Sequence, residues 1–155
     1  MDTVEAKTAM LIRRPVAPVF AAFVEPAITT RFWFSSASAA LQPGATVRWE
    51  WAMFGAAAEV RVIAFEPPRR LLIEWPGQGR QNSVEWIFTP HGDDHTLVAI
   101  RESGFDPTAP DVIAQVADAT GGFSLVLAGA KAYLEHGIEL NLVADRFPDG
   151  HTCAG

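Results

Sequence analysis

The chain has 155 residues, of which 49% are hydrophobic and 19% charged, and its formal net charge is -6. This length and apolar share predict one folded domain with one core and exclude an intrinsically disordered chain. With only 12 Lys and Arg residues the chain has no basic field for a phosphate backbone or an anionic bilayer, so neither nucleic acid nor a membrane surface is expected as a partner.

The N-terminal part predicts one strand and two short helices. Residues 3–13 alternate loosely between apolar and polar types, as a strand does, and end before Pro15. Residues 16–24 carry apolar side chains at helical spacing, with prolines confined to the first turn, where no backbone hydrogen bond is lost. A second short helix is predicted over residues 27–33.

From position 46 to position 104 the apolar period becomes two, and turn residues recur about every ten positions. This pattern predicts a run of antiparallel strands. The five predicted strands span residues 46–53, 57–65, 70–75, 82–89 and 96–103.

After Pro107 the apolar period returns to that of a helix, along a stripe from Val112 to Leu134. Thr108 or Asp111 can cap the start of this helix, and Gly137 can end it. The pair Gly121-Gly122 should weaken or kink the helix, which leaves open one kinked helix or two successive ones. The order of elements predicts an α+β fold in which the last helix covers the apolar side of the sheet.

Residue parity along the strands separates the sheet into two faces. One face collects Trp, Val and Phe side chains, and the other alternates between positive and negative charges. The charged face comprises Arg48, Glu50, Glu59, Arg61, Glu74, Glu85 and Arg101. We interpret it as a solvated outer face with cross-strand ion pairs rather than as a catalytic cluster.

Glu102 departs from this pattern in the last strand. If Arg101 faces outward, Glu102 faces inward together with Val98 and Ile100. A buried carboxylate is costly unless it is paired, hydrogen-bonded or protonated, so Glu102 is a candidate site residue. The alternative is that Glu102, beside Gly104 at the end of the strand, reaches water at the mouth of a cavity.

Other motifs carry little chemistry. His91 and His95 enclose Gly92-Asp93-Asp94, which is better explained as a hairpin turn than as a metal site. The sequence contains no nucleophile elbow, P-loop or CxxC motif. We therefore expect no metal and no cofactor.

Several segments together resemble a known family. They are Phe65-Glu66-Pro67-Pro68-Arg69-Arg70-Leu71, Glu74-Trp75, Trp86-Ile87-Phe88-Thr89-Pro90, Glu102-Ser103-Gly104-Phe105, Gly121-Gly122-Phe123 and Lys131-Ala132-Tyr133-Leu134-Glu135. They resemble the AHSA1 branch of the SRPBCC (START/polyketide cyclase/Bet v1) superfamily. The resemblance implies a helix-grip fold, with a curved antiparallel sheet of about six strands around a long C-terminal helix and a cavity between them. In that branch the last helix commonly opens with Gly-Trp, whereas this chain has Gly122-Phe123, so a roomier pocket is expected there.

The resemblance does not fix the function, because the superfamily contains ligand carriers, cyclases and co-chaperone domains. We expect a small apolar or aromatic ligand in the cavity, with Glu102 as its polar anchor. The candidate ligand-binding residues are Trp33, Trp49, Trp51, Trp75, Trp86, Phe88, Ile100, Glu102, Phe123 and Leu127. One alternative is a cyclase or aromatase that uses Glu102 as its acid or base; another is a co-chaperone-type interaction domain. For each ring taken singly, simple packing in the core is the commoner role.

The ends of the chain bear on its location. Residues 1–5 lack the basic and apolar regions of a secretory signal, and no uninterrupted apolar run approaches the length of a transmembrane helix. The single cysteine, Cys153, cannot form an internal disulfide and suits a reducing compartment. We therefore expect a cytoplasmic protein without membrane insertion, with one domain over residues 1–146 and a flexible tail over residues 147–155.

Overall fold

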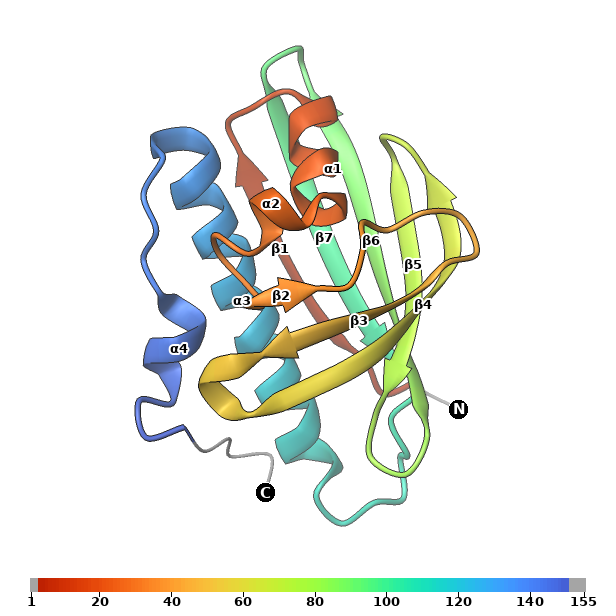
Figure 1. Cartoon of the computed structure of the whole chain (residues 1–155). Coiled ribbons are helices and arrows are strands. Elements are labelled where there is room, and N and C mark those ends of the chain that lie inside the picture. The colour runs from red at the N-terminus through yellow and green to blue at the C-terminus, as the bar shows by residue number, and fades with distance from the viewer. Residues whose placement is uncertain (1–2, 151–155) are drawn as a thin grey trace.

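A single curved antiparallel sheet forms the framework of the protein (Figure 1). The computed structural model describes residues 3–150, so Cys153 and the end of the predicted tail lie outside the described part. The strands are β1 (Ala6–Ile12), β2 (Ser36–Ala37), β3 (Thr46–Trp51), β4 (Ala56–Glu66), β5 (Arg70–Pro76), β6 (Gln81–His91) and β7 (His95–Ser103). Their order across the sheet is β1-β7-β6-β5-β4-β3-β2.

The helices lie on the side toward which the sheet curves (Figure 1). They are α1 (Val16–Val24), α2 (Pro26–Thr29), α3 (Val112–His136) and α4 (Leu142–Arg146), with a short 3-10 turn η1 (Ala52–Phe54). The long helix α3 packs mainly along β1, and α4 packs against α3. The predicted α+β helix-grip fold is confirmed.

The sheet has seven strands rather than about six. The additional strand β2 is only two residues long and pairs with β3 through Ser36–Glu50 and Ala37–Trp49. A strand of this length contains no alternation that a sequence pattern could reveal. It forms because β3 already offers an ordered edge for hydrogen bonding.

Several predicted element ends differ from the structure by one to four residues, and two of them are instructive. The second short helix stops at Thr29, and the chain then turns into the loop that carries Trp33. The Thr29 hydroxyl group donates to the backbone oxygen of Ala22 and so ties this end to α1. The third strand ends at Trp51, and residues 52–54 form η1, which is closed by Gly55 at a φ of 62°. A positive φ of this kind favours glycine.

Of the two alternatives left open at Gly121-Gly122, two successive helices are ruled out, since α3 is continuous over 25 residues. The glycines lie where the guanidinium of Arg146 from α4 rests, and a Cβ at Gly121 would lie 2.9 Å from Arg146 Nη2. The pair therefore faces the flexible end of a side chain from α4. Gly137, with a φ of 66°, ends the helix as predicted.

Helix α3 is also long and apolar enough, by length and composition, to cross a membrane. Its sequence contains no uninterrupted apolar run of that length, so the expectation from the sequence did not include it. A single helix of this kind is weak evidence for a membrane span, because core helices pass the same test. Here Phe123, Val126 and Leu127 of α3 are buried in the core.

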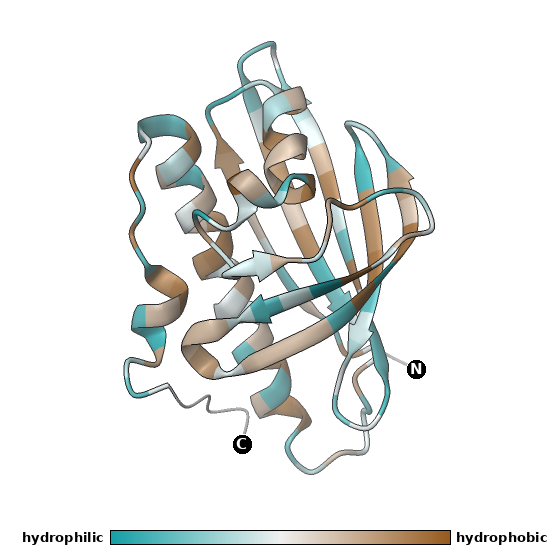
Figure 2. Ribbon diagram, viewed as in Figure 1, coloured by the Kyte–Doolittle hydropathy of each residue, from teal (hydrophilic) through white to brown (hydrophobic). Residues whose placement is uncertain are grey.

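Parity sorts the sheet faces as predicted. Trp49 and Trp86 are each 1% exposed and belong to the core cluster. On the outer face, charged side chains pair across strands, as in Arg61–Glu74 and Arg101–Glu85. The alternation of hydrophilic and hydrophobic residues along the strands is visible in Figure 2.

Candidate functional site

Glu102 lies on the inner face of the sheet near the end of β7. Its neighbours in register are Ala6 on β1 and Val84 on β6, and the residue is only 6% exposed. Its carboxyl oxygen Oε2 accepts hydrogen bonds from Trp75 Nε1 at 2.9 Å and from Asn82 Nδ2 at 3.1 Å. Both donors are neutral.

The protonation of Glu102 follows from this environment. Burial raises the pKa of the Glu102 carboxyl; the two hydrogen bonds lower it, the nearby Asp118 carboxylate raises it, and the net result is a raised pKa. A carboxyl group with a raised pKa can hold its proton in the pocket and donate it to an acceptor atom.

Two glycines leave room for the Asn82 side chain. A Cβ at Gly77 would lie 2.5 Å from Asn82 Oδ1, and a Cβ at Gly104 would lie 3.0 Å from the same atom. Gly104 also has a φ of 101°, a conformation that other residues rarely adopt. Asn82 is 3% exposed, and its Oδ1 atom has no hydrogen-bond partner within the described part of the chain. The two glycines therefore permit a buried amide that orients Glu102.

A pocket of about 230 Å³ opens beside Glu102, between α3, α4 and the sheet. Most of its wall is aromatic or aliphatic. It is lined by Trp33, Phe54, Trp75, Glu102, Asp118, Ala119, Gly122, Phe123, Leu125, Val126, Val143, Arg146 and Phe147. An apolar wall with few placed polar groups is typical of small-molecule sites.

The side of the pocket formed by α4 depends on Arg146. Its guanidinium lies 3.1 Å from a carboxylate oxygen of Asp118 on α3, and it donates to the backbone oxygen of Asp118. It also lies 4.9 Å from the centre of the Phe147 ring, which in turn meets Phe54 edge-on at 6.1 Å. These contacts link the C-terminal segment to the body of the domain.

The predicted site residues divide into two groups. Trp33, Trp75, Glu102 and Phe123 line the pocket. The other six pack in or against the core and line none of this pocket; they are Trp49, Trp51, Trp86, Phe88, Ile100 and Leu127. Ring contacts such as Trp33–Trp49 at 4.9 Å account for their position.

Sequence reasoning missed the pocket residues that come from η1 and from the C-terminal segment. Phe54 directly follows the predicted strand over residues 46–53, and Phe147 lies in the predicted tail over residues 147–155, while Val143 and Arg146 carry no recognised pattern. The signal that could have found them is the Gly121-Gly122 pair, because two adjacent glycines inside an apolar helix indicate another element packed closely against it.

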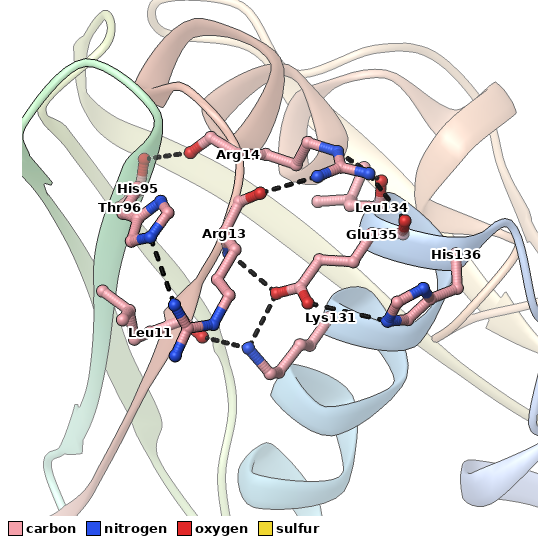
Figure 3. A network of polar contacts seen from close by, with 9 residues as sticks. All are labelled: Leu11, Arg13, Arg14, His95, Thr96, Lys131, Leu134, Glu135 and His136. Atoms are coloured by element: carbon pink, nitrogen blue, oxygen red, sulfur yellow. Dashed lines mark hydrogen bonds and ion pairs between the residues drawn. The ribbon is translucent and has the colours of Figure 1, made fainter.

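A second buried carboxylate, Glu135, lies at the opposite end of α3 (Figure 3). Its side chain is 7% exposed and its Oε2 atom accepts from Lys131 Nζ and from the backbone N–H of Arg13, each at 2.7 Å. Lys131 also donates to Leu11 O, and Arg14 donates to the backbone oxygens of Leu134 and Glu135. Burial raises the pKa of Glu135. The hydrogen bonds from Arg13 and Lys131 and the charges of Lys131 and His136 outweigh this effect, so the net pKa is lowered. This cluster joins the end of β1 to the end of α3.

The family model described as "Activator of Hsp90 ATPase homolog 1-like protein" matches residues 13–135. No curated protein matches the chain.

Solved structures share the fold. Protein SSP2350 from Staphylococcus saprophyticus is 26% identical, with a TM-score of 0.76 over 88% of this chain and 95% of its own. DynU16, a protein of the dynemicin biosynthetic locus, is 24% identical with a TM-score of 0.77, and the match spans 89% of this chain but only 49% of DynU16. The Aha1 dimer from Colwellia psychrerythraea is 16% identical, with a TM-score of 0.74 over 86% of this chain and 98% of its own.

Proposed function

This chain belongs to the family of activator of Hsp90 ATPase homolog 1-like proteins, within the SRPBCC superfamily, and from that premise we propose that it binds a small apolar or aromatic molecule in the pocket beside Glu102. The observation that carries the proposal is a buried carboxyl group, held by two neutral donors, at the wall of an otherwise apolar pocket. Apolar walls supply affinity and a single polar group fixes the orientation of a ligand.

The chemistry of Glu102 favours a ligand with an acceptor atom. Because burial raises the pKa of Glu102, the proton-bearing form can donate to a carbonyl or ether oxygen. A charged carboxylate would instead have to be desolvated against an apolar ligand, which costs free energy.

The same raised pKa favours one second candidate function, a cyclase or aromatase in which Glu102 is the general acid. Asp118 lines the same pocket and is ion-paired with Arg146. Conversion of a bound carbonyl compound by the wild-type protein, and its loss in Glu102→Gln with binding retained, would favour this enzyme over a carrier.

The binding proposal is tested with a pocket-filling variant. Ala119 lines the pocket, whereas Ala117, two residues away on α3, is exposed and lines none of the described pockets. We expect Ala119→Phe to weaken binding of the fluorescent, uncharged probe phenylnaphthylamine by about tenfold or more, the value of roughly one buried ring. Ala117→Phe is the matched control and should leave the affinity unchanged.

Native mass spectrometry of protein purified without detergent gives an independent measurement. We expect a bound apolar species in the wild type and less of it in Ala119→Phe. Equal probe affinity in wild type and Ala119→Phe, or no probe binding at all, would contradict the proposal.

A further inference from the structure

Glu102 is reached from two sides. Besides the apolar pocket, a second hollow of about 230 Å³ lies between the turn that joins β5 to β6 and the N-terminal half of α3. Glu102, Asp118 and Ala119 line both hollows. The two spaces therefore meet along one short wall, with the Glu102 carboxyl at the junction.

The chemistry of the two hollows differs. The second one is lined by three side-chain amides, from Gln78, Asn82 and Gln115, and by only one aromatic ring, that of Phe105. We call it the amide cleft. Amide groups offer both donors and acceptors, so they suit hydroxyl or amide groups of a ligand rather than hydrocarbon.

Size also favours a joined site. Each hollow, at about 230 Å³, lies below the roughly 300–1,000 Å³ that is typical of small-molecule pockets. The two together reach that range. A ligand that filled only the apolar pocket would leave the polar groups at the junction without new partners.

A buried polar atom at the amide cleft lacks a partner. Asn82 is 3% exposed and its Nδ2 atom donates to Glu102, while Oδ1 has no hydrogen-bond partner among residues 3–150. An unsatisfied buried acceptor is costly, and such atoms occur where a ligand or water completes the site. This oxygen is itself buried beside Gly77 and Gly104, so the amides that a ligand can meet in the cleft are those of Gln78 and Gln115.

From the shared wall and the amide lining, we infer that the amide cleft is a second subsite, and that the ligand is an uncharged amphiphile. Its apolar body occupies the pocket, an acceptor oxygen lies at Glu102, and a hydroxyl-bearing end enters the amide cleft. An anionic end is disfavoured because the Asp118 carboxylate lines the junction. This inference rests on the proposed binding function and adds the class of ligand.

The test uses two probes of equal length, (naphthyloxy)ethanol and propoxynaphthalene, which differ only in a terminal hydroxyl or methyl group. Each is measured by displacement of phenylnaphthylamine from the full-length protein. The readout is the ratio of the two dissociation constants, methyl probe over hydroxyl probe. We expect Gln115→Leu to lower this ratio by about fivefold to tenfold, the worth of one neutral hydrogen bond, and Gln78→Leu to lower it in the same direction.

Phe54→Leu, in the wall of the apolar pocket only, is the matched control, since it should weaken both probes and leave their ratio unchanged. Circular dichroism melting checks that each variant is folded. If both probes bind but neither glutamine variant changes the ratio, the amide cleft is no subsite and the binding function stands without it. If neither probe binds the wild type, the proposed function fails and this inference fails with it.

Discussion

The protein buries two carboxyl groups at opposite ends of α3, and it treats them in opposite ways. Glu135 is 7% exposed on its side chain and meets a lysine ammonium, a backbone N–H and the positive charge of nearby side chains. Glu102 is 6% exposed as a residue, and within residues 3–150 its Oε2 atom accepts from the neutral donors of Trp75 and Asn82. The pKa is lowered at Glu135 and raised at Glu102.

The difference separates a structural role from a site. A buried carboxylate with a cation and several donors holds elements together, here β1 and α3. A buried carboxyl without a cation costs stability when it ionises. Glu102 is of this kind, and it lies in the wall of both hollows. Perturbed groups of the second kind, next to a cavity, are the ones that point to function.

The largest expected change in stability comes from a substitution that breaks the Glu135 cluster. Lys131→Met removes the ammonium group that lies 2.7 Å from Glu135 Oε2 and leaves the carboxylate buried. We expect the free energy of unfolding to fall by about 1.5–3 kcal/mol, the range for hydrogen bonds to charged groups. Urea denaturation at neutral pH measures it. The comparison variant is Arg48→Met, whose guanidinium pairs with Glu50 on the surface, where the two side chains are 63% and 47% exposed; the free energy of unfolding should fall by about 0.2–1 kcal/mol. Equal losses would contradict the distinction.

A smaller effect, of opposite sign, is expected at Glu102. Its raised pKa means that the folded protein binds more protons than the unfolded chain between about pH 4.3 and the folded pKa, so this group makes stability fall as the pH rises through that interval. Glu102→Gln removes the penalty and should stabilise the protein at neutral pH by about 0.5–2 kcal/mol, as relief of a functional site often does.

At Glu135 the pH dependence of stability should have the opposite sign to that at Glu102. Because the folded pKa of Glu135 is lowered, its contribution is present above the unfolded pKa of about 4.3 and is lost as the pH falls through the folded pKa. Glu135→Gln should therefore destabilise the protein at neutral pH and flatten the acid limb of the stability curve. Unfolding curves for both variants over the acid and neutral range measure these slopes. Slopes of the same sign at the two sites would refute the assignment.

The smallest expected effect comes from removing one hydrogen-bond donor to Glu102. Trp75→Phe keeps an aromatic ring but removes the Nε1–H donor to Oε2, so the pKa of Glu102 should rise further. The loss of this hydrogen bond should lower the free energy of unfolding by about 0.5–1.5 kcal/mol. Carbon-detected NMR titration of the Glu102 carboxyl reports the pKa, and Trp51→Phe, at a tryptophan that lines none of the described pockets, is the control. A pKa unchanged in Trp75→Phe would mean that this donor does not act on Glu102.

The sequence by itself determined the class of fold and the inward position of Glu102. Alternation of side chains along strands is a local property, so parity alone placed Trp49 and Trp86 in the core and Arg61 and Glu85 outside. The helix stripe and Gly137 likewise fixed the extent of α3, because spacing and a left-handed glycine depend on near neighbours.

Only the tertiary structure decided which inward rings line a pocket and which fill the core. The rings on the strands share the same parity, and the difference arises from where α4 and η1 meet α3. That meeting involves contacts between residues such as Phe54 and Phe147, which lie far apart in the chain. The same holds for Gly121-Gly122: the local pattern left open one kinked helix or two successive ones, and the structure has one helix with Arg146 of α4 beside the glycines. Close approach between distant elements is invisible to a periodic pattern, and it is what shapes both hollows around Glu102.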